Sequence, residues 1–417
     1  MVNENQLIPH LFRTEYTKIT TVLCKLFGIE HIEVAEDLAS ETFLSALETW
    51  PFKGIPDNPV AWLYSVAKNK AKNYLNRHQL FKNRIVTQLK HSSSEKTEVD
   101  IDLSKKNITD SQLQMLFTLC HPCIPVDAQI ALSLRILCGF GIQEIANAFL
   151  VNKEAINKRL FRAKEKLRIE KVAIEFPSEQ EIDNRLDAVL TILYLVFNEG
   201  YYSESQDDVL REDLCFEAIR ITELLVNNEK TNLPKVNALL ALMYFHSSRF
   251  EARKGKNGEV ILYDDQDEKI WNQELILKGV FFLKHSSQGA KFSKYHIEAS
   301  IAYWHTQKIN ANEKWENILQ LYNLLLQLEY SPIAALNRTY AFSKIHGKKA
   351  AIIEAEKLNL SNNHYYFTLL GELYKENDLK KSIRYFEQAF LMAKTKHDRQ
   401  TIQLKIEELN QYNQAEQ

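Results

Sequence analysis

Apolar residues recur at helical spacing through most of the chain. The first such run ends at Gly28, and similar runs over residues 33–50 and 60–84 predict two further helices. Pro51 is expected to end the first of these two, and the Gly- and Pro-containing stretch "FKGIPDNP" to form a loop between them. The pattern therefore predicts a helical domain over residues 7–90.

The rest of the chain divides at two polar stretches. Residues 91–109 lack an apolar period and predict a linker, after which a helical unit spans 110–171. A long helical region then fills 180–417, so the chain is expected to be all-α. Its segment "YYFTLLGELYKENDLKKSIRYFEQAFLMAK" resembles a tetratricopeptide repeat (TPR), although an irregular helical bundle would show the same period. The residues that carry this likeness are Gly371, Tyr374, Ser382, Phe386 and Ala389.

Residues 142–168 predict a helix-turn-helix. Apolar residues give each helix an inner face, and Asn152 is suited to cap the second helix after a turn at 150–152. The outward side chains are expected to be Lys153, Glu154, Asn157, Lys158, Arg159, Arg162, Lys164, Lys166 and Arg168. Since recognition helices place their first turns on base edges, we assign Lys153, Glu154, Asn157 and Lys158 to bases and Arg159 and Arg162 to the DNA backbone.

Composition and charge indicate which class of protein the chain belongs to. The chain has 417 residues, a net charge of −2, and only 11 Gly and 9 Pro. No apolar run approaches a membrane span and no secretory signal begins the chain, so we expect a cytoplasmic protein without membrane contact. Residues 61–90 hold seven basic residues and no acid, and residues 152–171 hold eight basic and three acidic residues. Two basic blocks suggest two contacts with a polyanion.

The sequence contains no convincing catalytic or metal-binding motif. Cys120 and Cys123 form a C-x-x-C without a second ligand pair, so buried structural thiols are the preferred interpretation. The acids near Asp264 lack the Gly and distal Glu of a calcium loop. Aromatic residues such as Tyr201 and Trp271 are more often core than ligand cage. We expect no enzyme, no metal and no cofactor.

Three stretches of the chain resemble regions 2 and 4 of the extracytoplasmic-function (ECF) sigma factors of the sigma-70 superfamily. "DAQIALSLRILCGFGIQEIANAFLVNKEAINKRLFRAKEKLR" is similar to region 4, the promoter −35 reader. "AEDLASETFLSALETW" is similar to the region 2 helix that grips the polymerase β′ coiled coil, and "NPVAWLYSVAKNKAKNYLNRHQ" to the −10 recognition helix. The family usually has Gln at Ser40, Arg at Lys68 and Asp at Asn73.

The resemblance implies partners and residue roles. The partners are core RNA polymerase, through its β′ coiled coil and β subunit, and promoter DNA. Polymerase contacts fall on Asp37, Ser40, Glu41, Phe43 and Leu44. Contacts to the −10 element fall on Phe52, Lys53, Asp57, Asn58, Trp62, Lys68, Asn69, Lys70, Lys72, Asn73, Asn76 and Arg77, and those to the −35 element on the region 4 residues assigned above together with Lys166. For Trp62, a buried core position is the preferred interpretation.

The C-terminal region resembles the TPR-like extension of one ECF subgroup, which implies a regulatory domain that binds a protein or peptide. From residue 172 onward the chain carries 29 basic and 35 acidic residues, so the extension could mask the DNA-binding faces or could equally be needed for activity. Two rivals stay open. One is a free-standing helix-turn-helix regulator whose repeats sense a peptide, and the other is a TPR scaffold with a relic DNA module.

Overall fold

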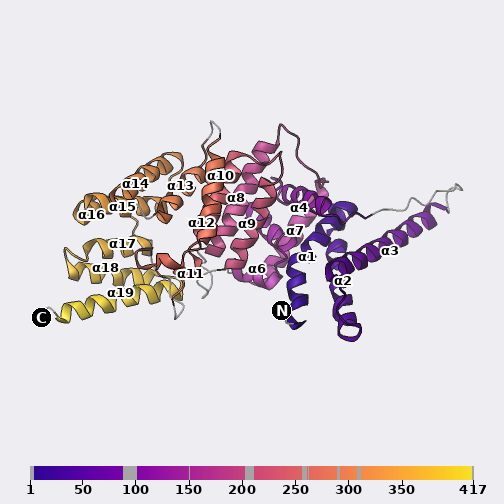
Figure 1. Cartoon of the computed structure of the whole chain (residues 1–417), viewed down its shortest axis with the longest axis horizontal. Helices are drawn as coiled ribbons and strands as arrows, with labels where there is room; N and C mark the ends of the chain where they lie inside the picture. Colours follow the sequence, from indigo (N-terminus) through magenta and orange to yellow (C-terminus); the bar gives the residue numbers. More distant parts are fainter. Residues whose placement is uncertain are drawn as a thin grey trace. The chain divides into compact units, whose positions relative to one another are not determined.

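The computed structural model describes residues 4–87, 101–149, 151–201, 211–255, 261, 263–288, 292–307 and 311–415. The chain is 79% helical, and the described residues contain no strand, which confirms the all-α expectation. It forms two compact units, Met1–Ile192 and Leu193–Gln417, with the division inside helix α8 (Ile182–Tyr201). Figure 1 labels the helices of both units.

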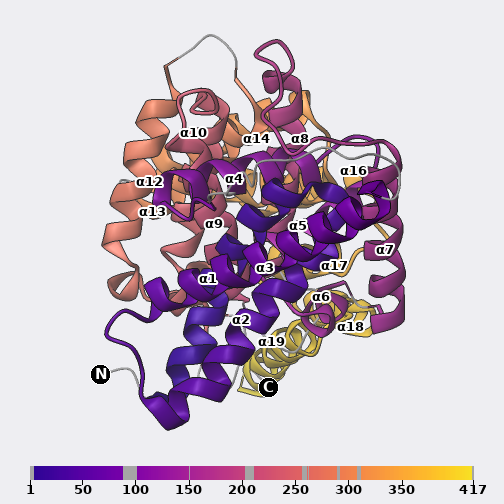
Figure 2. The same ribbon diagram turned by 90° about the vertical axis from the view of Figure 1, so that its right-hand side faces the viewer.

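The N-terminal unit contains seven helices in its described part besides the first half of α8. They are α1 (Glu4–Phe27), α2 (Ile32–Lys53), α3 (Pro59–Thr87), α4 (Lys105–Leu119), α5 (Val126–Ile136), α6 (Ile142–Ala148) and α7 (Lys153–Ile169). Helix α1 packs against α2, α3 and α4 (Figure 2), and its Tyr16, Ile19 and Leu23 are almost fully buried. The core of this unit therefore forms around α1.

Two predicted boundaries differ from the structure. Helix α2 continues through Pro51 to Lys53 and ends at Gly54, whose φ of 83° suits glycine. Pro51 has no N–H to donate to the preceding turn, and only two helical residues follow it. Helix α4 begins at Lys105, inside the predicted linker, because the Ser104 hydroxyl caps it by accepting from the Asn107 N–H. Residues 91–100 of that linker and Leu150 of the predicted turn lie outside the described residues.

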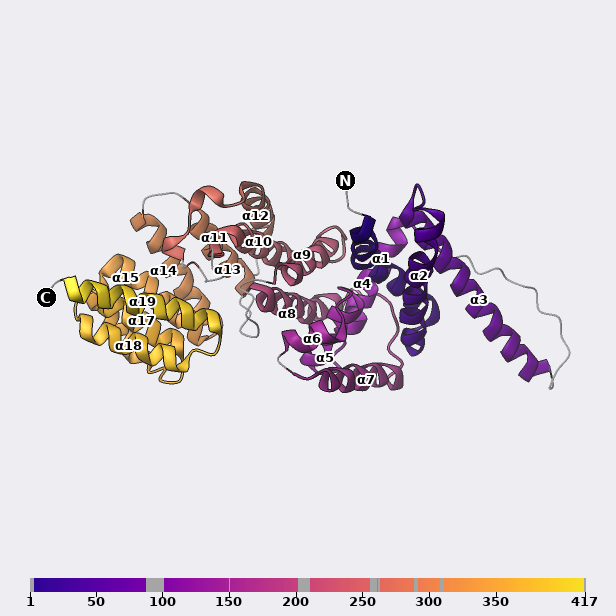
Figure 3. The same ribbon diagram turned by 90° about the horizontal axis from the view of Figure 1, so that it is seen from below.

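The C-terminal unit is a succession of helices, each packed on the next from α12 onward. Figure 3 shows the neighbouring helices at its C-terminal end. The bounds are α9 (Glu212–Val226), α10 (Pro234–Ser247), α11 (Phe250–Arg253), α12 (Gln273–Ser286), α13 (Lys294–Thr306), α14 (Ala311–Leu328), α15 (Pro332–His346), α16 (Lys348–Leu358), α17 (His364–Tyr374), α18 (Leu379–Met392) and α19 (Lys396–Ala415).

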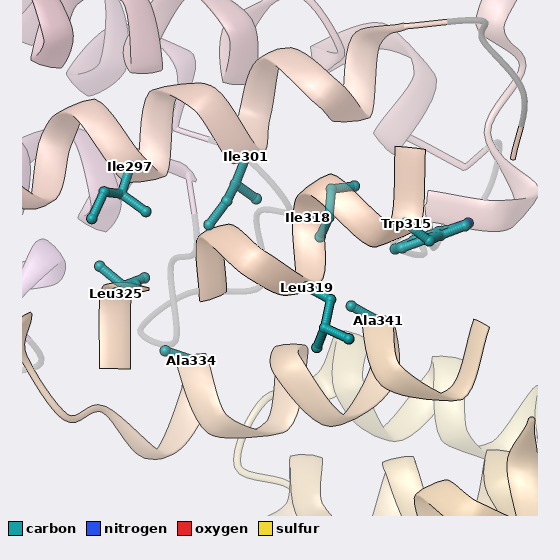
Figure 4. Close-up of a cluster of buried hydrophobic side chains, with 8 residues drawn as sticks. All are labelled: Ile297, Ile301, Trp315, Ile318, Leu319, Leu325, Ala334 and Ala341. Atoms are coloured by element: carbon teal, nitrogen blue, oxygen red, sulfur yellow. The ribbon is translucent and has the colours of Figure 1, made fainter. Parts of the chain in front are cut away.

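Three apolar clusters follow one another along this unit. The first joins α13, α14 and α15 and includes Ile301, Trp315 and Leu319 (Figure 4). The second lies among α15, α16 and α17, and the third between α18 and α19. Each helix pair thus buries its apolar face against its neighbours.

The α17–α18 pair shows why glycine occurs at residue 371. A Cβ there would come within 2.8 Å of the Phe386 ring, and the Ser382 hydroxyl donates to the Gly371 carbonyl at 2.8 Å. The close approach of the two helices therefore requires a residue without a side chain.

Candidate nucleic-acid interface

The residues predicted to grip polymerase lie on α2, mostly on its exposed side. Asp37, Ser40, Glu41 and Leu44 are exposed at helical spacing, and Leu44 and the neighbouring Leu47 retain 52% and 53% of their accessible surface. This face combines two carboxylates with two exposed leucines, a combination suited to a partner that presents both basic and apolar groups.

Phe43, which the resemblance assigned to the polymerase contact, is a buried residue of α2. Phe43 retains only 3% of its accessible surface and packs on Phe12 and Tyr16, with ring centroids 5.0 and 6.3 Å away. It forms part of the wall of a shallow apolar groove between α1 and α2. Pro9, Phe12, Leu44 and Leu47 also line this groove. Sequence reasoning missed Pro9 and Phe12, because nothing in the chain pattern pairs the start of α1 with α2.

The basic block of α3 surrounds a buried strip of Leu63, Ala67 and Ala71. Its exposed side chains are Asn69, Asn73, Asn76 and Arg77, whereas Lys68, Lys70 and Lys72 are half-buried. The Lys70 ammonium lies 3.2 Å from the Glu41 carboxylate, so a residue predicted to bind DNA pairs with one predicted to bind polymerase. Exposed pairs of this kind contribute about 0–1 kcal/mol, so a ligand can separate them.

Trp62 is half-buried and lies edge-on to Trp50, with ring centroids 5.4 Å apart. The preferred interpretation of Trp62 as a packing residue agrees with this contact.

The segment before α3 is divided between helix and loop. Phe52 and Lys53, expected in the loop, belong to the last turn of α2, where Phe52 keeps 88% of its surface. Asp57 is exposed. The Asn58 side chain accepts a hydrogen bond from the Ala61 N–H at 3.0 Å and so caps α3. Phe52 is therefore the aromatic residue of this segment that is open to stack on a base.

Helices α6 and α7 form the predicted pair of helices. The Asn152 side chain caps α7 by accepting from the Ala155 N–H at 2.7 Å, as expected. The inner face is also confirmed, since Ile156, Leu160, Ala163 and Leu167 are buried. Lys153, Glu154, Asn157, Lys158, Arg162 and Lys166 are exposed.

The exposure of two α7 residues differs from the predicted DNA-binding surface. Phe161 was not among the candidates, yet it keeps 66% of its surface between Asn157 and Arg162. Its spacing of four from Asn157 was the available signal. Arg159 is half-buried, with its guanidinium over the Phe149 ring at 5.3 Å and 3.7 Å from the Asp127 carboxylate. Arg162 is thus a freer cation for the DNA backbone than Arg159.

Part of this architecture matches a known protein family. Residues 11–81, which cover α1, α2 and most of α3, match the sigma-70 region 2 family. Residues 11–81 thus form a sigma-70 region 2 domain, which supports a place for the chain in the sigma-70 family. Region 2 of this family implies binding to core RNA polymerase and promoter DNA.

The other matches do not name a function. Over 387 residues the chain is 33% identical to an uncharacterized protein of Rhizobium meliloti (strain 1021), covering 91% of this chain and 90% of the relative. Residues 185–287 match a family of unknown function, DUF6596. None of the solved structures matches the chain significantly. No helix in the described part of the chain is long and apolar enough to cross a membrane.

The region 2 domain forms ion pairs with α5 and α7. Lys164 and Arg168 were predicted to point outward, but both contact acids of α2. The Glu36 carboxylate, 8% exposed, lies 2.6 Å from the Lys164 ammonium and 2.8 Å from the Arg135 guanidinium. The Arg168 guanidinium lies 3.0 Å from the Glu33 carboxylate. These two cations therefore link α7 to region 2, where the Lys164 side chain is 12% exposed and that of Arg168 is 35% exposed.

The cysteines fit the structural interpretation. Cys24 and Cys120 are buried, and burial raises the pKa of the Cys120 thiol to about 12. Cys123 is only partly buried, and burial again raises its pKa. Reactive and metal-binding cysteines need a lowered pKa. Among the residues that the structure describes, no three His, Cys, Asp or Glu side chains gather as a metal site.

Proposed function

We propose that this chain is an ECF-type RNA polymerase sigma factor that directs promoter recognition, DNA melting and transcription initiation. The observation that carries the proposal is the region 2 match, on which an acidic and apolar face of α2 lies next to the basic and amide face of α3. The first face suits the polymerase coiled coil, and the second suits the −10 strand, whose backbone is anionic.

In this proposal α7 reads the −35 element. Its exposed first turns, Lys153 to Lys158, suit base edges, and Arg162 and Lys166 suit phosphates. Lys166 is within 2.6 Å of the Glu170 carboxylate, an exposed pair that phosphate can replace. The support is the capped helix and its exposed basic face.

The C-terminal helices are proposed to form a TPR-like regulatory domain that binds a protein or peptide. Three successive apolar clusters support a repeat arrangement. In this proposal the domain either inhibits transcription or supports it.

The polymerase part of the proposal is tested by the affinity of the full-length protein for core polymerase. Replacing Asp37 with Arg or Leu44 with Ala should weaken binding by about tenfold or more, since each removes a charge or apolar contact at the centre of the proposed face. Glu229→Arg provides a matched control, because Glu229 is an exposed acid of the C-terminal unit.

The same variants distinguish the sigma-factor proposal from the two alternative functions. A free-standing regulator would bind DNA without polymerase, so Asp37→Arg would leave its activity unchanged and wild-type protein would not bind core polymerase. A scaffold with a relic DNA module would show no change in promoter binding on Arg162→Glu. Arg162 is a cleaner probe than Arg159, which also packs on Phe149.

A further inference from the structure

A buried arginine in the C-terminal unit forms no ion pair with any acid that the structure describes. Arg249 lies between α10 and α11 and keeps 8% of its surface. Its Nη2 donates to the Tyr201 hydroxyl at 3.2 Å, and its Cζ is 5.5 Å from the centroid of the Tyr263 ring. Its Nε has no hydrogen-bond partner, and none of the described carboxylates forms an ion pair with it.

Two more cations lie around the same tyrosines. The Lys314 ammonium, on a residue 8% exposed, donates to the Tyr263 hydroxyl at 2.6 Å and to the Gln307 carbonyl at 3.2 Å, and no described acid forms an ion pair with it. Burial lowers the pKa of Lys314, Glu268 opposes this, and Arg249 adds to the lowering. Arg253 stacks on the Tyr201 ring with its Cζ 3.9 Å from the centroid.

The cluster also contains polar groups without partners. Trp271, 3% exposed, lies beside Tyr263 with ring centroids 6.3 Å apart, and its Nε1 donates to no described group. The His305 ring is 4.6 Å from Tyr263 and the His246 ring 4.6 Å from Tyr201, and each has an unpaired Nδ1. Burial, reinforced by Arg249, holds the pKa of both histidines well below the usual value, so both are neutral.

These features are costly unless a ligand is bound. A buried cation without a counterion and a buried N–H without an acceptor each destabilise a fold. A ligand that carries negative oxygens would neutralise the cations and accept from the free N–H groups together. The surrounding rings of Tyr263, Trp271 and Trp315 offer apolar faces to the rest of such a ligand.

We propose that Arg249, Lys314 and Trp271 form a binding site for a small oxyanion, a phosphate or a carboxylate, inside the C-terminal unit. Arg249 supplies the charge and a free N–H, Lys314 a second charge, and Trp271 a neutral donor. The inference uses only residues of this unit, so it holds or fails independently of the sigma-factor proposal.

The test is calorimetric titration of the full-length protein, purified without oxyanions, with inorganic phosphate and separately with succinate. Sodium chloride at equal ionic strength corrects for general charge screening. We expect saturable binding of at least one oxyanion. Arg249→Met should weaken it by about tenfold or more, because a charge-assisted hydrogen bond is lost. Trp271→Phe, which keeps a ring but removes the donor, should weaken it by a smaller factor.

The control is Lys375→Met, which removes an exposed lysine of the same unit and should leave the affinity unchanged. Circular dichroism establishes that each variant is folded, and Lys314→Met replaces Arg249→Met if the latter does not fold. Binding of phosphate alone or of succinate alone identifies the anion class and supports the site. The proposal is overturned if neither anion binds beyond the chloride control, or if the folded Arg249 or Lys314 variant binds as tightly as the wild type.

Discussion

Glu298, on α13, couples the stability of the C-terminal unit to pH. Burial raises the pKa of this carboxyl to about 7 from 4.5, against the opposing effects of Lys294 and of the hydrogen bond that the Tyr194 hydroxyl donates at 3.3 Å. The folded protein therefore keeps a proton on Glu298 between these two values while the unfolded chain has lost it. The contribution of Glu298 to the free energy of unfolding is fully present below about pH 4.5 and is lost as the pH rises to about 7.

Glu298→Gln should remove this pH dependence, because glutamine resembles the neutral acid and does not ionise. Each pH unit within the window costs the wild type at most about 1.4 kcal/mol of unfolding free energy. The thermal midpoint of the variant should thus exceed that of the wild type at pH 8 by more than at pH 5. The exposed Glu229→Gln is the control, and equal pH profiles for wild type and Glu298→Gln would refute the assignment.

Among elements, α2 connects region 2 to the helices that follow it. Its outer face carries the proposed polymerase residues, whereas Glu36 on another face meets Arg135 of α5 and Lys164 of α7. Removing one partner of a buried ion pair leaves the remaining buried charges without a counterion. This lowers the free energy of unfolding far more than the loss of an exposed pair.

Glu36→Gln should therefore lower the free energy of unfolding by roughly 2–3 kcal/mol, whereas Glu33→Gln, at a side chain 49% exposed, should lower it by less than about 1 kcal/mol. Denaturant titration of the full-length variants measures both. Equal effects of the two substitutions would mean that the Glu36 contacts do not hold these helices together.

Sequence predicted the elements better than their contacts. Helical period and the Asn152 cap are local, so helices α6 and α7 could be predicted from residues 142–168 alone. The burial of Phe43 and the pairing of Lys164 with Glu36 depend on residues far apart in the chain. Arg249 likewise gave no signal, because only the fold brings it to Tyr201 and Tyr263. The sequence suggested that Tyr201 and Trp271 were ordinary core residues.

At the scale of the molecule, the proposed function requires the contact between α2 and α7 to break. Lys70 pairs with Glu41, five residues from Glu36, and Lys153 is eleven residues from Lys164, or roughly 17 Å along α7. The −10 and −35 elements are about 25 base pairs apart, roughly 85 Å of B-DNA. We therefore expect the contact between Glu36 and Lys164 to open when α3 and α7 bind the two elements in the proposed way.

Run-off transcription with core RNA polymerase and the full-length protein tests the central claim most directly. The account predicts specific transcripts from promoter fragments of genomic DNA, loss of those transcripts with Asp37→Arg, weaker ones with Arg162→Glu, and no change with Glu229→Arg. If the wild-type protein neither binds core polymerase nor directs specific initiation, the sigma-factor account is wrong and a free-standing regulator takes its place.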